Sequence, residues 1–447
     1  MADLGRKLGL WHAVAIVVGT VIGSGVFVTL PIVAQEAGAP LPAVLAWLVG
    51  GLLWVPQVLL LAELGTAYPE NGFAYLYLTR AGSRALAFLY VWTVFWTSDT
   101  PSISIIALSA SSALGTILPG LGAGWQARAL ASSLIVGLTF VHVRDVRIGG
   151  NVQIGLTVAK LLPLVLLVFA GLAGGGDWNF AGQWGPISAR PLMAAVAATT
   201  WSYAGFPNIL YMAGEIARPG RNLPLALIGS VLGVTLAYTL ISLATSAIVP
   251  FADLAAAQGT FVNPFRYLPV LASVAASFLA LSAFVSMVGA ASACIMVQPR
   301  IQYAIARDGY WPRVFASVHP RFQTPHVSIL AQSGLAVVLV LVGGIENLLG
   351  YFTLSYLLQN ALVYAVVPWL RRRPDYCPAY RAPCWVGLVA LSVLTQLYLA
   401  YGTFVAYPSA GVLAAAALIG TGLPVYGVYH RRAQRKTARG EKCSRGN

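Results

Sequence analysis

Two apolar stretches of the sequence carry helix-weakening residues near their centres. The first contains Gly-Ser-Gly at 23–25, and a later one contains Gly205 and Pro207. Glycine tolerates unwound backbone, and proline removes a hydrogen-bond donor and clashes with the preceding turn. Unwound backbone offers N–H groups, which attract a carboxylate, and C=O groups, which attract an ammonium. These residues therefore predict reversible binding of a zwitterionic α-amino acid without any charged side chain.

Two ionisable side chains add to this chemistry, because Lys160 and Asp99 are the only formal charges well inside apolar runs. Such residues are functional candidates, since each costs at least ~2.5–3.5 kcal/mol at the centre of a membrane helix. Three interpretations of the carboxylate remain open. It pairs with a cationic substrate side chain, it carries a proton, or it turns away and bonds to Ser98, Thr100 or Ser102.

The elements that position these residues are membrane helices. Of the 447 residues, 58% are hydrophobic and only 9% are charged, against about 25% charged in soluble domains, and the mean hydropathy is +0.77. We predict an all-α polytopic membrane protein whose first apolar run is a span and not a cleaved signal peptide. Twelve runs are long enough to cross a bilayer: 10–34, 40–62, 84–115, 125–143, 152–173, 191–214, 223–249, 267–299, 326–344, 349–369, 384–406 and 409–429.

The positive charges indicate the orientation of these spans. With both termini in the cytoplasm, all but four of the 27 lysines and arginines fall on cytoplasmic segments, the exceptions being Arg128, Arg190, Arg266 and Lys160. This bias follows the positive-inside rule and predicts a multi-pass protein of the plasma or inner membrane with cytoplasmic ends. The net charge of +14 is therefore topological, so no nucleic-acid partner is predicted. The basic tail 430–447 is expected to contact anionic membrane lipid.

The two weakened runs are spans one and six, which occupy matching positions if the first ten spans form two five-helix repeats. Because five is odd, the two repeats have opposite orientations in the membrane. Paired interrupted helices of this kind point to the midplane binding site of a secondary transporter. Close helix packing at Gly19 and Gly23, or a kink at Pro207, explains each interruption singly. Neither explains their matched placement, so transport by alternating access is favoured.

Other functional classes fit the sequence less well. A channel requires a continuous polar face, an enzyme requires clustered catalytic groups, and a receptor typically adds a soluble domain. Few polar residues recur on one face of any span, the five histidines are scattered, and no predicted loop is long. The four cysteines lack metal-ligand spacing, and GLAGGG at 171–176 lacks the Lys-Ser/Thr of a phosphate-binding loop. Neither enzyme activity nor a metal or cofactor is predicted.

Four separated motifs resemble the amino acid–polyamine–organocation (APC) transporters. They are GTVIGSGVF in the first span, AELGTAYPENGFAYLYL at 62–78, WSYAGF running into GEIARPGRNLP at 214–224, and RIQYAIARDGYWPRVFASVHPRFQTP at 300–325. Within that superfamily they are most similar to the L-type amino acid transporter branch and its bacterial relatives, over about residues 8–370. The resemblance implies a leucine-transporter-like fold, with a five-plus-five inverted repeat, helices 1 and 6 unwound at mid-membrane, and spans eleven and twelve outside the repeat.

The implied organisation has five parts. They are a cytoplasmic N-terminus (1–9), a first five-helix repeat (10–173), a second inverted repeat (191–369), helices 11 and 12 (384–429) and the basic cytoplasmic tail (430–447). The implied activity is sodium-independent movement of α-amino acids, with spans one and six rocking against a scaffold of spans three, four, eight and nine. Neutral amino acids are favoured because the pocket is otherwise apolar and aromatic. The alternative is a cationic amino acid or polyamine held by Asp99, and exchange and proton coupling both stay open.

The resemblance also places the substrate. Its carboxylate is expected at backbone N–H groups around Ser24, Gly25 and Val26, and its amino group at carbonyls of both interrupted spans. Trp201 stands where the family often carries an aromatic residue that closes over the substrate. The predicted substrate-binding set is Val21, Ile22, Gly23, Ser24, Gly25, Val26, Asp99, Trp201, Ser202, Tyr203, Ala204 and Gly205.

Lys160 matches a lysine that, in the family, replaces the sodium ion of related transporters by bridging span one to span eight. Its ammonium is expected to bind a carbonyl near Gly19 and polar groups at Gly289 to Ser292. Ser286 is a further candidate. Snorkelling to the cytoplasmic surface is disfavoured, because the residue lies about 12 Å into its span at 1.5 Å per residue.

The sequence departs from the family pattern at three places. Asn-Gly at 71–72 stands where relatives usually show Ser-Gly-Gly, and Phe206 stands where many L-type members have tryptophan. The loop at about 116–124 lacks the cysteine by which animal L-type carriers link a heavy subunit, so no disulfide-linked heavy subunit is expected.

Charged residues gather at the cytoplasmic ends of spans six and eight. Glu215 lies near two arginines of the loop after span six, and Asp308 lies among the arginines that follow span eight. Ion pairs between these groups could latch an inner gate. The other interpretation is that they are solvated loop charges, which contribute little.

Overall fold

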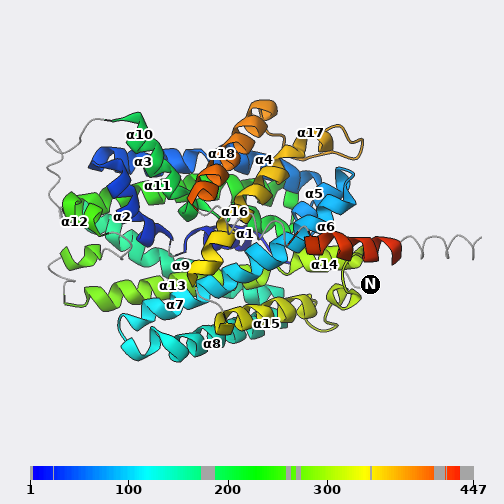
Figure 1. Ribbon diagram of the computed structural model, residues 1–447, viewed down its shortest axis with the longest axis horizontal. Helices are drawn as coiled ribbons and strands as arrows, with labels where there is room; N and C mark the ends of the chain where they lie inside the picture. Colours follow the sequence, from blue (N-terminus) through cyan, green and yellow to red (C-terminus); the bar gives the residue numbers. More distant parts are fainter. Residues whose placement is uncertain are drawn as a thin grey trace, which may run out of the picture.

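The chain forms a bundle of helices whose long axes mostly follow the long axis of the molecule (Figure 1). The computed structural model describes residues 4–23, 25–172, 187–257, 263–267, 273–342, 345–406, 418 and 420–432. Over these residues the β-structure is limited to two isolated bridges. Five helices there are long and apolar enough to cross a membrane: Pro40–Ala67, Gly124–Arg144, Val146–Leu172, Pro219–Ile248 and Ala275–Arg307.

The N-terminal half divides two of its apolar runs into pairs of helices and a third into three segments. Its elements are α1 (Leu10–Val21), α2 (Gly25–Ala37), α3 (Pro40–Leu52), α4 (Val55–Ala67), α5 (Ala74–Arg80), α6 (Arg84–Thr93), the π-helical segment η1 (Val94–Asp99), α7 (Thr100–Gly115), η2 (Pro119–Leu121), α8 (Gly124–Arg144) and α9 (Val146–Leu172).

The C-terminal half opens with a helix that gives way to successive 3₁₀ turns. Its elements are α10 (Ala189–Thr199), η4 (Thr200–Tyr203), η5 (Phe206–Tyr211), η6 (Ala213–Glu215), α11 (Pro219–Ile248), α12 (Phe251–Ala256), η7 (Pro264–Tyr267), α13 (Ala275–Val297), α14 (Arg300–Arg307), η8 (Arg313–Ala316), α15 (His326–Val342), α16 (Ile345–Ala365), α17 (Val367–Leu370) and α18 (Trp385–Ala406).

The predicted spans agree with these helices at most of their ends. The third run, predicted over 84–115, begins and ends at the same residues in the structure, and the eleventh differs by one residue. The helix of the eighth run begins at Ala275, later than the predicted residue 267. Much of the predicted twelfth span lies outside the described residues, and a helix covers 420–432. The short helix α5 was not predicted, and neither was α12.

The interior of the bundle is organised around α1, which packs against α9, α11 and α13 and lies near the centre of the view in Figure 1. Small residues permit the closest approaches. A Cβ built on Gly171 of α9 would lie 2.6 Å from the Cβ of Ala244 in α11. The outer faces of α8 and α9 expose large apolar side chains, among them Phe140, Leu162 and Phe169. Such a belt suits a lipid environment.

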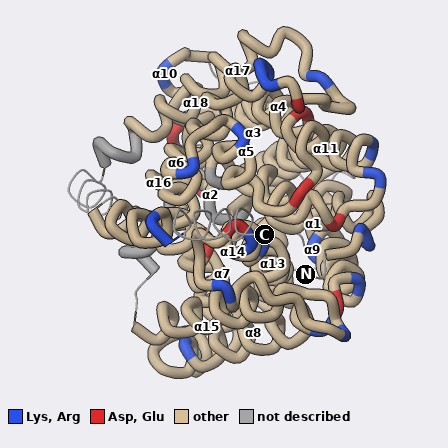
Figure 2. The backbone as a smooth tube through the Cα atoms, turned by 90° about the vertical axis from the view of Figure 1, so that its right-hand side faces the viewer, with Lys and Arg blue, Asp and Glu red and all other residues tan. Residues whose placement is uncertain are grey.

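One end of the bundle carries the N-terminal segment together with α5, α6, α14 and α17 (Figure 1). Figure 2 looks onto this end, and its coloured backbone marks lysine, arginine and acidic residues at several places around it. Arg80 forms two ion pairs here, a local one with Glu70 at 3.0 Å and one with Asp375, distant in sequence, at 3.3 Å. This is the end that the charge bias predicts to be cytoplasmic.

Candidate functional site

The α-helical backbone of the first apolar run is interrupted between α1 and α2. The N–H of Ile22 still donates to the carbonyl of Val18 at 2.9 Å, but that of Gly23 turns back to Val21 at 3.0 Å. In the sixth run, α10 ends at Thr199 and the chain continues in 3₁₀ turns. The first run leaves the α-helical pattern at its glycines, whereas the sixth leaves it after Thr199, six residues before Gly205.

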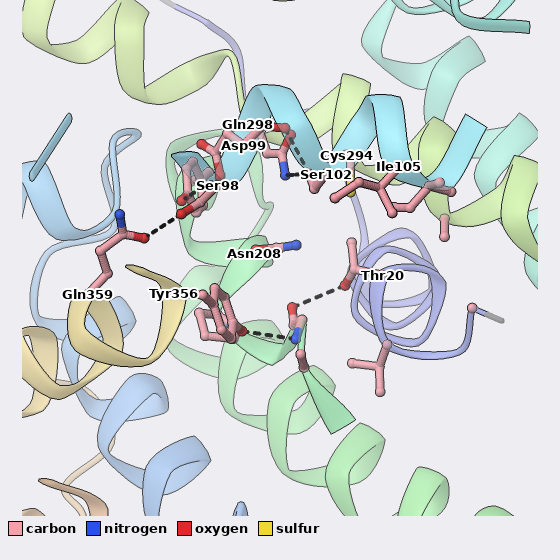
Figure 3. Close-up of a pocket in the computed structure, with 18 of the residues that line it drawn as sticks. Thr20, Ser98, Asp99, Ser102, Ile105, Asn208, Cys294, Gln298, Tyr356 and Gln359 are labelled. Carbon is pink, nitrogen blue, oxygen red and sulfur yellow. Dashed lines mark hydrogen bonds between the residues drawn. The ribbon is translucent and has the colours of Figure 1, made fainter. Parts of the chain in front are cut away.

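The two interrupted segments touch at Gly205. This residue has φ of +126°, which glycine adopts at little cost. A Cβ built on it would lie 2.9 Å from the carbonyl carbon of Thr20. The Thr20 hydroxyl donates to the Gly205 carbonyl at 3.1 Å, and the Gly205 N–H donates to the hydroxyl of Tyr356 at 3.2 Å (Figure 3). Only a residue without a side chain fits here.

A second link between the interrupted segments comes from α11. The hydroxyl of Tyr238 lies 3.3 Å from the carbonyl of Val21 and 3.3 Å from that of Ser202. Tyr238 is fully buried, so its hydroxyl needs a partner inside the protein. A carbonyl has two lone pairs, and the Val21 oxygen also accepts from the N–H of Gly23 at 3.0 Å, so both of its acceptor positions are used.

A cavity of about 130 Å³ lies beside these segments. Six predicted residues line it, namely Val21, Gly23, Gly25, Asp99, Ala204 and Gly205. Further lining residues, outside the predicted substrate-binding set, are Thr20, Phe73, Tyr90, Ser98, Ser102, Asn208, Tyr211, Cys294, Gln298, Tyr356, Gln359 and Asn360. Figure 3 shows Asn208 reaching between the side chains around Asp99 and Thr20.

The other predicted substrate residues lie behind this surface or outside the described part. Ile22, Val26 and Ser202 are buried and are not among the described lining residues. Ser24 and the side chain of Trp201 lie outside the part that the structure describes. Any closing role of this tryptophan therefore stays a prediction.

Tyr203 is directed away from the cavity. Its hydroxyl donates to the carbonyl of Trp47 at 2.7 Å, and its ring packs against Tyr238 with centroids 5.1 Å apart. Its side chain therefore joins span six to α3 and α11. Tyr203 can therefore contribute to substrate binding through its backbone but not through its side chain.

Asp99 ends the π-helical segment η1 and lies at the cavity surface, 5% exposed. One carboxylate oxygen accepts from the hydroxyl of Tyr211 at 3.3 Å. The neighbouring serines do not bond to the carboxylate. Ser98 donates to the side chain of Gln359 at 2.8 Å, and Ser102 donates to the backbone carbonyl of Asp99 at 2.8 Å.

Lys160 lies inside α9 and is 1% exposed. Its ammonium donates to the carbonyl of Gly19 at 2.7 Å and also to that of Ile22. Ser286 of α13 shares this position, since its hydroxyl lies 3.4 Å from the Ile22 carbonyl and 3.0 Å from that of Gly23. The lysine and the serine therefore satisfy carbonyls that the end of α1 would leave without donors.

The remaining predicted partners of the lysine have other donors. The Gly289 carbonyl accepts from Gln153 at 3.1 Å, and the Ser292 hydroxyl bonds to His142 at 2.9 Å. Gln153 and His142 were missed by the sequence reasoning. A glutamine two turns before Lys160 in an apolar run was the available signal, because a buried amide requires partners.

A second, larger cavity of about 830 Å³ lies among charged residues, including Arg6, Arg84 and Asp308. Phe73 lines the first cavity, whereas Asn71 and Tyr75, on either side of it in the chain, line the second. The N–H of Gly72 donates to the carbonyl of Tyr211 at 2.9 Å. This segment therefore separates the two cavities.

The segment around η6 contacts both the N-terminal segment and α14, at the end of the bundle that carries the charged residues. Leu8 pairs with Ile216 in an isolated bridge. Glu215 and Arg300 form an ion pair at 2.9 Å, with both side chains 1% exposed. Arg300 therefore pairs with Glu215 inside the protein, and the interpretation of these two charges as solvated loop residues is wrong.

A bundle of apolar helices, with two interrupted segments that meet beside a cavity lined by apolar and polar side chains, defines a multi-pass membrane protein. The chain belongs to the amino acid permease family, whose family model matches residues 8–424. Members of this family are transporters and not enzymes.

Individual relatives cover most of the chain. It is 28% identical to the serine/threonine exchanger SteT of Bacillus subtilis, over 96% of this chain and 98% of that protein. It is 29% identical to the b(0,+)-type amino acid transporter 1 of Oryctolagus cuniculus, over 79% of this chain and 73% of that protein. It is 26% identical to the Asc-type amino acid transporter 1 of Mus musculus, over 96% of this chain and 82% of that protein. All three relatives are therefore amino acid transporters or exchangers.

Proposed function

We propose that this protein moves α-amino acids across the membrane by alternating access without sodium. The observation that carries the proposal is the meeting of two interrupted segments beside one cavity, joined by Thr20 and Gly205 at 3.1 Å. Backbone groups at such interruptions bind the carboxylate and the ammonium of a zwitterion. The serine/threonine exchanger of B. subtilis supports this substrate class, because the similarity spans nearly all of both chains.

The proposed organisation is a twelve-span protein with two inverted five-helix repeats, 10–173 and 191–369, unwound in the first and sixth spans. Both termini are proposed to lie on the cytoplasmic side of the plasma or inner membrane, as the distribution of lysine and arginine favours. Lys160 of α9 supports sodium independence, because its ammonium donates a hydrogen bond to the carbonyl of Gly19 in α1, with the two atoms 2.7 Å apart. A fixed cation at this position makes a bound sodium ion unnecessary.

The neutral-substrate prediction rests on the apolar and aromatic part of the lining, such as Ile105, Phe73 and Tyr90. A cationic amino acid or polyamine is the second candidate, and Asp99 in the same lining favours it. The test is uptake of labelled amino acids into proteoliposomes preloaded with unlabelled amino acid. Equal uptake in sodium and in choline buffers is expected, and uptake that requires sodium would contradict the proposal.

A further inference from the structure

The charge at the cavity wall is placed by an unusual piece of helix. Span three is α-helical through Thr93, π-helical over Val94–Asp99, and α-helical again from Thr100. A π-helical turn inside an α-helix is rare and occurs often at functional sites, because it changes the face on which later residues lie. Asp99 is the last residue of this turn and lines the cavity.

The bonding of Asp99 is incomplete. A carboxylate accepts at two oxygens with about four lone-pair positions. One oxygen accepts from Tyr211 at 3.3 Å. The other, Oδ2, is buried and has no hydrogen-bond partner within the described part of the chain. The side chain is 5% exposed, so water does not freely replace the missing partner. A buried acceptor of this kind is costly unless a ligand supplies a donor.

No lysine or arginine belongs to the described lining of the cavity, which leaves Asp99 without a protein counter-charge there. Lys160, the other charge inside a span, is committed to the carbonyls of Gly19 and Ile22. Some neutral polar groups of the wall bond to one another, since Gln298 donates to Ser102 at 3.1 Å and Ser98 donates to Gln359 at 2.8 Å (Figure 3). The compensating cation is therefore expected to come from a ligand.

We propose that Asp99 forms a second subsite, which binds the side-chain cation of an α-amino acid carrying an additional amine or guanidinium. This inference rests on the proposed function, because the α-amino and α-carboxylate groups are taken to bind at the interrupted segments. Phe73, Tyr90 and Tyr211 line the same cavity and offer aromatic faces to a cation. The subsite makes such substrates preferred over neutral ones of the same shape.

The test compares ligands that differ only in charge. Arginine and citrulline have nearly the same shape, but citrulline replaces the guanidinium with a neutral urea group. Apparent Kd values would be measured by ligand-dependent thermal stabilisation of the purified full-length protein. We expect arginine to bind at least about tenfold more tightly than citrulline, because hydrogen bonds to charged groups are the stronger ones. Asp99→Asn is expected to bring this ratio to about one, because the charge that favours the guanidinium is removed.

A control variant and a second substitution keep the result interpretable. Asp253→Asn makes the same chemical change in α12, where the carboxylate accepts from the exposed Tyr267 hydroxyl at 3.1 Å, and should preserve the wild-type ratio. If Asp99→Asn does not fold, Asp99→Ser carries the same expectation. A wild-type ratio of about one would overturn the subsite, and so would a ratio that survives the loss of Asp99.

The remaining outcomes separate this inference from the proposed function. Binding of citrulline and other neutral amino acids with no preference for arginine would overturn the subsite and leave amino acid transport standing. Loss of transport in Asp99→Asn for every substrate, with no preference in the wild type, would indicate a proton carrier and would also overturn the subsite. Failure of the folded protein to bind any amino acid would overturn both proposals.

Discussion

Phe73 stacks on Tyr211, with ring centroids 5.1 Å apart and an angle of 28° between the rings. The contact joins the loop before α5 to the 3₁₀ turns of span six, at the wall between the two cavities. Phe73 holds this position with φ of +46° and ψ of −123°, a backbone conformation that side-chain-bearing residues rarely adopt. Such strain persists where the surrounding structure compensates for it, often at switch regions. The stacked pair is therefore a candidate inner gate.

Substitutions of Phe73 should separate the strain from the ring. Both Phe73→Ala and Phe73→Gly lose the buried ring, which typically costs about 3–5 kcal/mol. The glycine variant also loses the strain, so we expect it to be the more stable of the two by about 1 kcal/mol. Chemical denaturation in detergent measures the difference. Ala74→Gly, one residue later inside α5, is the control and should show the ordinary destabilising effect of glycine. An alanine variant at 73 as stable as the glycine variant would contradict the strain.

Lys160→Ala should abolish amino acid uptake while the protein still folds. The substitution removes the ammonium from the carbonyls of Gly19 and Ile22, so the end of α1 loses a donor that holds it against α9. Uptake into proteoliposomes and the elution profile in size-exclusion chromatography measure the two effects. Lys7→Ala, at the N-terminal end before α1, should retain transport. Unchanged uptake by the Lys160 variant would contradict the role of this residue as a substitute for sodium.

The buried pair of Glu215 and Arg300 should behave as a unit. Removing one partner leaves an uncompensated buried charge, so Glu215→Gln is expected to lower stability by about 3–5 kcal/mol. Glu215→Gln combined with Arg300→Met removes both charges and should recover part of that loss. Thermal unfolding of Glu215→Gln, Arg300→Met, the double variant and the wild type gives the comparison. A double variant destabilised by at least the sum of the two single effects would show that the two charges do not compensate each other.

Gly205→Ala should impair both folding and transport. The added methyl group meets the carbonyl of Thr20 at 2.9 Å, and φ of +126° is unfavourable for alanine, so we expect a loss of about 1–3 kcal/mol. Gly233→Ala in α11 is the matched control, because a Cβ there meets nothing within 4 Å. It should be neutral or slightly stabilising. Wild-type melting and uptake in the Gly205 variant would contradict the close contact.

The apolar pattern and the glycines were sufficient to predict most helix ends, because a helix that crosses a membrane needs an apolar run about 20 residues long. The third run illustrates this, since its ends at 84 and 115 agree with the structure. The π-helical turn inside it was not predicted. Its residues, Val94 to Asp99, have no distinctive composition, and the turn packs against α16, which is distant in sequence.

The site was predictable where it depends on backbone, and less so where it depends on side chains from distant spans. Glycine and proline mark the interruptions locally, so Gly23, Gly25 and Gly205 could be placed at the cavity from sequence. Tyr238 and Tyr211 reach the site from positions that no local pattern distinguishes. A tyrosine inside a span signals only that its hydroxyl needs a partner, and the partner is decided by the fold.

The shared hydroxyl of Tyr238 has a consequence for which helices move during transport. One phenol, which has a single hydrogen to share, lies at equal distances of 3.3 Å from the Val21 and Ser202 carbonyls, so a displacement of either segment alone lengthens one of the two contacts. Both contacts survive only if α11 travels with the two segments. The boundary between mobile and stationary helices is then expected on the far side of α11. A cysteine cross-link between α11 and span one would leave turnover intact, whereas one between α1 and α13 would stop it.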